Sequence, residues 1–296
     1  MTDLVPVRCC IRDVSFEKVP MTVTSTAILY HSGSGSTKLV ATVIAEKLVK
    51  SGPVELVPIS FEYDTGRIQS YQVLVFGFPT HHCNPSRSMR EFFDMLPEAD
   101  GSVPVHLFTT YGLYSANTLR IAARSLAEKG YITTGYMGLR GPGSDGALLL
   151  PEWIRPMFRY EKRAQEKIDE FVSGVRSSVG RGDPVLRMPR YAWYAPLNAP
   201  NSILGDRSYG RYKDRMRADA DFCISCGRCV EKCIRGCWRM ENDVPVFDAE
   251  NCEFCLGCIH NCPAGAILFS EKSRNKPRLN GEFYNALKPT LFRGGE

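Results

Sequence analysis

Two runs of regularly spaced cysteines constrain this chain more than any other feature of its sequence. The first run, CISCGRCVEKC, places Cys223, Cys226, Cys229 and Cys233; the second, CEFCLGCIHNCP, places Cys252, Cys255, Cys258 and Cys262. Both follow the pattern C-x2-C-x2-C-x3-C and together hold eight of the twelve cysteines. In a reducing compartment, clustered cysteines indicate metal binding or redox chemistry rather than disulfide bonds.

The doubled pattern resembles that of the bacterial two-cluster ferredoxins. In that family, three cysteines of one run and the fourth of the other run hold each [4Fe-4S] cluster. The resemblance implies that cluster I takes Cys223, Cys226, Cys229 and Cys262, and that cluster II takes Cys252, Cys255, Cys258 and Cys233. Two zinc sites are the alternative, but zinc usually takes its cysteines as two pairs separated by a longer gap.

The first run departs from the ferredoxin pattern because Ile234, rather than proline, follows Cys233. Cys237 lies four residues beyond Cys233 and could replace it as a ligand or remain a spare thiol. The spacing favours Cys233 as the ligand. We interpret the nearby Trp238 and His260 as packing residues.

Apolar segments of two kinds alternate from about Thr22 to Val175. Five have the composition of buried strands and four have helical spacing; the strands are predicted at 22–30, 54–60, 72–78, 103–112 and 131–139, and the helices at 37–50, 86–96, 116–130 and 160–172. Gly130 is the expected C-terminal cap of the third helix. Strands separated by helices predict an α/β domain over residues 22–176, with a doubly wound, five-stranded parallel sheet covered on both faces.

The remaining segments give the predicted domain plan. Residues 1–21 form an N-terminal extension, 177–220 a basic aromatic linker, 221–270 a small α+β cluster domain and 271–296 a C-terminal tail. The linker has five aromatic residues, which suggest that it packs on the protein: Tyr191, Trp193, Tyr194, Tyr209 and Tyr212. From Arg176 to Arg217 it carries nine Lys or Arg against three Asp. This stretch is either a solvated connector or a docking strip for an acidic protein, and it shows no nucleic-acid-binding motif.

Neither a membrane span nor a secretory signal is visible in the sequence. No run of about eighteen apolar residues occurs. The first twenty residues, MTDLVPVRCCIRDVSFEKVP, lack a basic start followed by an apolar core. We therefore expect a cytoplasmic protein without a membrane span. The sequence leaves the oligomeric state open.

A loop of small residues, SGSGST, separates the first predicted strand from the first predicted helix. It comprises Ser32, Gly33, Ser34, Gly35, Ser36 and Thr37. A helix N-terminus offers free backbone N–H groups and favours an anion such as phosphate, while the glycines allow close approach. The loop matches neither the G-x-G-x-x-G fingerprint nor the Walker sequence. A hydroxyl-rich loop of this kind suits a phosphate monoester, although a flexible turn without a ligand is the alternative.

The string ILYHSGSGSTKLVA resembles the phosphate loop of the flavodoxins, with Ser36 in place of their usual asparagine. The resemblance implies FMN as the ligand and two further flavin loops, 76–87 and 108–117. Candidate contacts there are Pro79, Thr80, His81, His82, Thr110, Tyr111, Gly112 and Tyr114. These loops follow the third and fourth predicted strands, where doubly wound sheets bind ligands. We interpret Cys83 as an inert loop thiol.

The two resemblances together imply a flavodoxin-like domain followed by a ferredoxin domain. We therefore expect an electron-transfer protein with FMN and two [4Fe-4S] clusters that serves a redox partner, such as a larger reductase or a low-potential pathway. No nicotinamide fingerprint, nucleophile elbow or carboxylate pair is visible. Two alternatives remain: a flavin reductase with a small substrate of its own, and a flavin-free docking subunit of a redox complex.

Overall fold

The computed structural model describes residues 25–150, 159–178, 184–195, 210 and 212–291. The predicted N-terminal extension lies outside these residues, together with Cys9, Cys10 and Tyr209. Parts of the predicted linker and the last residues of the tail also lie outside them.

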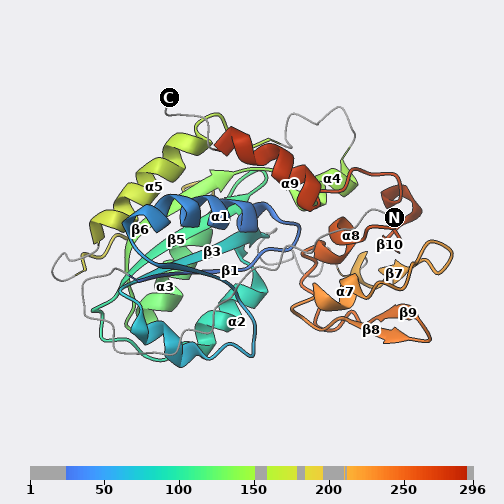
Figure 1. Cartoon of the computed structure of the whole chain (residues 1–296), viewed down its shortest axis with the longest axis horizontal. Helices are drawn as coiled ribbons and strands as arrows, with labels where there is room; N and C mark the ends of the chain where they lie inside the picture. Colours follow the sequence, from blue (N-terminus) through green and yellow to red (C-terminus); the bar gives the residue numbers. More distant parts are fainter. Residues whose placement is uncertain (1–24, 151–158, 179–183, 196–209, 211, 292–296) are drawn as a thin grey trace, which may run out of the picture.

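A parallel sheet forms the centre of the first unit (Figure 1). Its strands are β1 (Thr26–Tyr30), β2 (Val54–Pro58), β3 (Val73–His81), β5 (Pro104–Tyr111) and β6 (Ile132–Arg140). They lie in the order β2-β1-β3-β5-β6, and all neighbouring pairs run parallel. The short β4 (Asn84–Pro85) pairs antiparallel with the end of β3. This is the flavodoxin-like strand order, so the predicted doubly wound α/β fold is confirmed.

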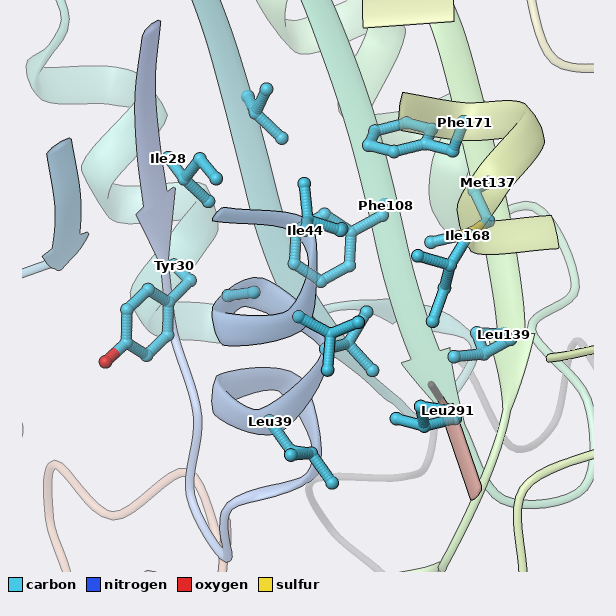
Figure 2. Packing of buried hydrophobic residues seen from close by; sticks show 14 of the residues in the cluster. Ile28, Tyr30, Leu39, Ile44, Phe108, Met137, Leu139, Ile168, Phe171 and Leu291 are labelled. Carbon is cyan, nitrogen blue, oxygen red and sulfur yellow. The ribbon is translucent and has the colours of Figure 1, made fainter. Parts of the chain in front are cut away.

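Helices cover both faces of the sheet, because each presents one apolar stripe to it. One face packs against α1 (Ser36–Leu48) and α5 (Ala164–Ser178), where Ile44 and Ile168 meet Phe108 in one core cluster (Figure 2). The other face packs against α2 (Arg87–Met95) and α3 (Thr118–Glu128). Gly130 follows α3 at φ 83°, as its predicted role in ending the helix requires.

One helix of the first unit was not predicted. The short α4 (Ser144–Leu149) follows β6, and its Ala147 and Leu148 are buried. Ala147 belongs to the core around α1 and α5, whereas Leu148 packs into the core of the second unit. The helix therefore connects the two units. Short 3₁₀ segments also occur in the described ranges, at 49–51, 65–70, 271–273 and 288–291.

The second unit is built around the two cysteine runs. It contains two short helices, two antiparallel strand pairs and a core that includes Trp238, Ile259 and Phe269; the elements are α7 (Arg228–Glu231), α8 (Gly257–Asn261), β7 (Arg217–Ala218), β8 (Trp238–Glu241), β9 (Val244–Phe247) and β10 (Ile267–Leu268). Because β7 pairs with β10, and Met216 lies in this core, residues before Asp221 also pack into the second unit.

The predicted tail is part of the folded body. Its helix α9 (Gly281–Leu287), red in Figure 1, begins after Asn280, whose side-chain oxygen accepts a hydrogen bond from the Phe283 N–H at 3.0 Å. Tyr284 and Leu291 are buried in the core formed with α1 and α5. Because most of the segment is polar, these two buried residues could not be recognised from the sequence.

The described part of the linker contacts the first unit through its backbone, whereas the side chains of Tyr191 and Trp193 are 57% and 80% exposed. The Arg187 N–H donates to the Thr133 carbonyl on the edge strand β6 at 2.7 Å. The Arg120 guanidinium of α3 donates to the Pro189 carbonyl at 2.9 Å.

Among the helices in the described ranges, none has the length and apolarity needed to cross a membrane.

Candidate functional site

A cavity of about 340 Å³ opens at the carboxyl ends of β1, β3 and β5. All predicted loop contacts line it except Gly35: Ser32, Gly33, Ser34, Ser36, Thr37, Pro79, Thr80, His81, His82, Thr110, Tyr111, Gly112 and Tyr114. Cys83 and Leu113 also line it. Three loops far apart in sequence are thus brought to one place, and the cavity volume lies in the range of small-ligand sites.

The small-residue loop forms the end of this cavity nearest α1. Gly35 precedes the helix at φ 136°, a backbone conformation that favours glycine. The Ser32 hydroxyl accepts a hydrogen bond from the Lys38 N–H at 3.2 Å, which fixes the loop against the first turn. The Thr37 hydroxyl lies 2.8 Å from that of Thr110 and so ties this loop to β5. The loop can therefore present hydroxyl and backbone donors to an anion at the positive end of the α1 dipole.

The other two loops form the side walls. The chain turns sharply after β3, with positive φ at His82 and Cys83. Burial lowers the pKa of His81 to about 4, so its ring is neutral near pH 7. Burial raises the pKa of Tyr111, while Tyr114 is 40% exposed and contacts the Tyr194 ring. Tyr111 and Tyr114 are thus placed to flank a planar ligand.

Sequence reasoning missed two parts of the wall. The segment around α4 contributes residues from Pro142 to Gly146. The second cysteine run contributes Phe254 and Cys255, so a predicted cluster ligand lines the same cavity as the small-residue loop.

Backbone atoms of the two units touch at this point. A side-chain carbon added to Gly33 would lie 2.6 Å from the Cys255 carbonyl oxygen, and one added to Gly257 would lie 2.9 Å from the Gly33 carbonyl oxygen. Separations this short exclude any larger residue unless the backbone shifts. Glycine at both positions therefore permits the second cysteine run to lie directly on the small-residue loop.

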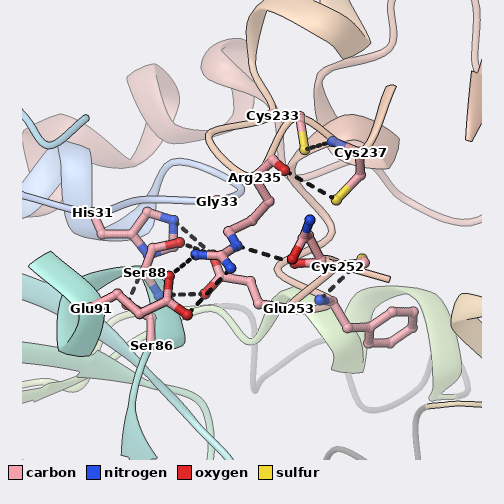
Figure 3. A network of polar contacts seen from close by, with 12 residues as sticks. His31, Gly33, Ser86, Ser88, Glu91, Cys233, Arg235, Cys237, Cys252 and Glu253 are labelled. Carbon is pink, nitrogen blue, oxygen red and sulfur yellow. Dashed lines mark hydrogen bonds and ion pairs between the residues drawn. The ribbon is translucent and has the colours of Figure 1, made fainter. Parts of the chain in front are cut away.

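A buried polar network holds this interface together (Figure 3). Glu253, between two cysteines of the second run, accepts hydrogen bonds from the Ser88 N–H and hydroxyl at 2.9 and 3.0 Å. Its carboxylate lies 3.1 Å from His31 Nε2, and His31 Nδ1 lies 2.8 Å from the Ser86 hydroxyl. Burial alone would raise the pKa of Glu253, but the nearby His31 and His81 and the Ser88 hydrogen bonds together hold it below its usual value.

An ion pair reinforces the same interface. Arg235, two residues after the first cysteine run, pairs with Glu91 of α2, which Arg87 also contacts at 2.7 Å. The Arg235 side chain is 7% exposed, and its guanidinium lies over the Phe61 ring. A largely buried arginine of this kind needs such partners to compensate for lost hydration.

The cysteines of the two runs gather in two sets. Cys223, Cys226 and Cys229 line one small cavity together with Cys262, which comes from the other run. The Ala266 N–H donates to the Cys262 sulfur at 3.3 Å. These four residues could hold one cluster. No group of three or more His, Cys, Asp or Glu side chains in the described ranges is arranged to hold a single metal ion.

The second set contains Cys252, Cys255, Cys258 and Cys233, with Cys237 beside them. Burial raises the pKa of the Cys258 thiol, and the neighbouring Cys252 and Cys233 raise it further. The buried indole N–H of Trp238 has no conventional hydrogen-bond partner in the described residues and lies beside Cys258, where it can donate to sulfur. The Phe254 N–H donates to the Cys252 sulfur at 3.3 Å. These donors suit a second sulfur-rich centre.

Cys237 and His260 both have contacts that the sequence did not indicate. The Cys237 N–H donates to the Cys233 sulfur at 3.4 Å (Figure 3). The buried ring of His260 not only packs, as expected, but also bridges three segments. Its Nε2 lies 3.0 Å from the Ser144 carbonyl, and its Nδ1 accepts from the Leu279 N–H at 3.0 Å. The ring therefore ties α8 to α4 and to the segment before α9.

Comparison with known proteins gives two separate matches, while no family model matches the chain. An uncharacterized ferredoxin of Methanocaldococcus jannaschii is 34% identical over 67 residues, which cover 20% of this chain and 87% of the ferredoxin. A flavodoxin of Clostridium saccharobutylicum is 33% identical over 69 residues, which cover 23% of this chain and 43% of the flavodoxin. The two relatives match different parts of the chain. Over the matched segment the chain belongs to the ferredoxin family, and its other unit has the flavodoxin-like fold.

The chain is also similar to solved flavodoxin structures. Reduced flavodoxin of Megasphaera elsdenii is 19% identical and has a TM-score of 0.39; the match covers 51% of this chain and 98% of that flavodoxin. A flavodoxin from the domain Archaea is 15% identical and has a TM-score of 0.38, with 52% of this chain and 99% of that flavodoxin covered.

Proposed function

We propose that this fusion protein transfers electrons between FMN, bound in the cavity of the flavodoxin-like unit, and two [4Fe-4S] clusters in the ferredoxin unit. One observation carries the proposal: Cys255, a predicted ligand of cluster II, lines the cavity that the three predicted flavin loops form. A flavin exchanges one or two electrons, whereas each cluster exchanges one, so their pairing connects two-electron and one-electron carriers. A shared wall makes the path between them short.

The residues present fit both groups. The small-residue loop offers hydroxyl and N–H donors for a phosphate, and Tyr111 and Tyr114 stand where they can flank a planar ring. Phe254 and Cys255 line the side of the cavity that the second cysteine run forms. The crossed sets would hold the clusters: Cys223, Cys226, Cys229 and Cys262 for cluster I, and Cys252, Cys255, Cys258 and Cys233 for cluster II.

The position of the first run suggests where a partner docks. Cys226 is exposed, and the neighbouring Phe222 and Ile224 are 52% and 63% exposed. An exposed apolar patch beside a cluster is a suitable contact for a redox partner protein or a larger reductase. The basic linker could add attraction for an acidic surface on that partner.

A second candidate is a flavin reductase with a small anionic substrate. A further cavity of about 120 Å³ shares His81 and His82 with the flavin cavity. Arg87 and Arg90 also line it, and both carry positive charge, although Glu253 is present as well. Substrate-dependent reoxidation of the pre-reduced protein by small oxyanions or carboxylates would favour this candidate over pure electron transfer.

The decisive experiment is a cofactor analysis of protein purified without oxygen. We expect one FMN released per chain on denaturation, with about eight irons and eight sulfides. Zinc in place of iron would contradict the cluster assignment, and absence of flavin would favour the docking-subunit alternative. Photoreduction followed at flavin and cluster wavelengths then tests whether electrons equilibrate between the two.

A loop variant tests the flavin site separately. Ser34→Ala combined with Thr37→Ala should weaken FMN binding by about 3–6 kcal/mol if both hydroxyls contact the phosphate, and by less if water substitutes. The iron content should remain, since the cysteines hold the clusters. Thr42→Ala is the control, because that hydroxyl lies on α1 and donates to the Lys38 carbonyl at 2.9 Å.

A further inference from the structure

One contact of the small-residue loop comes from outside both predicted cofactor domains. Tyr284, on α9, places its hydroxyl 3.1 Å from the Ser34 hydroxyl. The ring is 3% exposed and lies directly against Gly35, where an added side-chain carbon would be 2.6 Å from the ring. The loop and α9 are thus fitted to one another, and neither tolerates a larger group at this point.

The two hydroxyls differ in what they face. Ser34 lines the cavity, whereas Tyr284 is not among the residues that line it. Burial raises the pKa of Tyr284 to about 12, so its hydroxyl keeps its proton near pH 7. A serine hydroxyl has one proton to donate and can accept from others. If the tyrosine donates to the serine oxygen, the serine proton is left to point into the cavity.

We propose that Tyr284 is a positioning residue that orients the Ser34 hydroxyl toward the phosphate of FMN, so that phosphate recognition depends on α9. The inference rests on the proposed function, because it needs flavin in the cavity. The chain of donors runs from the Tyr284 hydroxyl to the Ser34 hydroxyl and then to a phosphate oxygen. Hydrogen bonds in such a chain polarise and strengthen one another, and the anion at its end makes the last bond strong.

A second tyrosine shows why Tyr284 is the specific one. The Tyr160 hydroxyl lies 3.0 Å from the Ser36 hydroxyl, but it also donates to the Ser36 carbonyl at 3.2 Å. Because a phenol has one proton, a bond to the carbonyl leaves none for the Ser36 hydroxyl. Tyr160 therefore has no proton left for a loop hydroxyl, whereas the Tyr284 hydroxyl, which also contacts Ser36, can donate to the Ser34 oxygen.

The test compares FMN with riboflavin, which has the same ring system but no phosphate. Iron-loaded protein freed of its flavin is titrated with each, as wild type and as Tyr284→Phe. We expect FMN affinity to fall about threefold to tenfold, the effect of one hydrogen bond, and riboflavin affinity to stay within twofold. Tyr131→Phe is the control: Tyr131 is also buried, and its hydroxyl donates at 2.8 Å to the Pro97 carbonyl, away from the cavity.

The serine side of the contact gives an independent check. Ser34→Ala should lower FMN affinity by at least as much as Tyr284→Phe, and adding Tyr284→Phe to it should change the ratio of FMN to riboflavin affinity no further. An equal loss for both flavins in Tyr284→Phe would mean a merely structural role and overturn the inference. An unchanged ratio in Ser34→Ala would overturn it too, even if no variant of Tyr284 folds. Wild type that binds neither flavin would instead overturn the proposed function.

Discussion

Each cysteine run begins with a loop that spans its first three cysteines, residues 223–229 in the first loop and 252–258 in the second. The two loops have the same backbone shape, but the first is exposed to solvent and the second is buried against the other unit. Ser225 and Gly227 in the first loop have φ of 53° and 67°, and Phe254 and Leu256 at the matching positions of the second have 55° and 62°. Yet Ile224 in the first loop is 63% exposed, whereas Glu253 at the matching position is 5% exposed. The cysteine spacing determines the shape of each loop, and the residues between the cysteines determine what the loop packs against.

This difference assigns separate roles to two similar centres. The second loop lies on the small-residue loop of the flavodoxin-like unit and helps to form its cavity. The first loop faces solvent with apolar side chains. Disturbing the second loop should therefore affect the flavin site, while disturbing the first should affect only its own cluster and an external partner.

The largest expected effect comes from a matched pair of ligand variants, Cys255→Ser and Cys226→Ser. Each should lower the iron content by up to half, since each removes one ligand of one cluster. Cys255→Ser should also weaken FMN binding about tenfold or more, because that loop contacts Gly33. FMN titration and iron analysis measure the two effects. Equal FMN affinities in the two variants would contradict the distinction drawn between the loops.

A smaller effect is expected when the residue after the first cysteine of each run is replaced. In Glu253→Gln, the new side-chain NH2 group would face groups that now donate hydrogen bonds to the Glu253 carboxylate. Because two donors cannot pair, the change should destabilise the protein by about 2–4 kcal/mol. Ile224→Gln changes an exposed side chain and should stay within about 0.5 kcal/mol. Denaturant unfolding under anaerobic conditions measures both. Similar values would show that burial at position 253 has little energetic weight.

Lowering the pH should destabilise the folded protein through His81, which lies near Glu253 of the second loop. The pKa of His81 is lowered to about 4 by burial, and the charged or titratable groups around it are Glu253, His31, His82 and Asp145. An unfolded chain binds a proton at this histidine near pH 6.5, and the folded chain only near pH 4, so stability present above pH 6.5 is lost as the pH falls. Between pH 7 and 5 wild type should lose about 2 kcal/mol more than His81→Gln. Parallel stability curves would rule out this contribution.

The smallest expected effect concerns Cys237, the extra cysteine that follows the first run. Cys237→Ala should keep its full iron content, because Cys237 lies beside Cys233 and donates its N–H to that sulfur. Cys233→Ala should lose iron from cluster II. Electron paramagnetic resonance of the reduced proteins identifies which cluster is changed. The reverse result, with iron lost only from Cys237→Ala, would make Cys237 the fourth ligand.

The sheet was predictable because runs of β-branched and apolar residues mark strands buried on both faces. The three cavity loops were predictable because they follow those strands, and because SGSGST resembles a known phosphate loop. α4 was not predictable: six residues, SDGALL, are too few to show a helical period. The predicted tail looked polar because its anchors, Leu279, Tyr284 and Leu291, are widely spaced.

The interface between the two units could not be predicted from the sequence for a different reason. Glu253 and Ser88 are separated by 165 residues, and nothing local to either one indicates the other. A glutamate between cysteines is as compatible with solvent as with burial. Only the packing of the two units shows that this carboxylate, His31 and two serines form one network.

The contact between Ser34 and Tyr284 also bears on how the protein is made. The two residues are 250 positions apart, so the ribosome adds Tyr284 long after the small-residue loop has emerged. At about 5–20 residues per second, that delay is roughly 10–50 s. During this interval the parallel sheet can fold, but the loop lacks both α9 and the second cysteine run. High-affinity capture of FMN should therefore follow translation of α9, and a nascent chain arrested before it should prefer FMN over riboflavin less strongly than the full chain does.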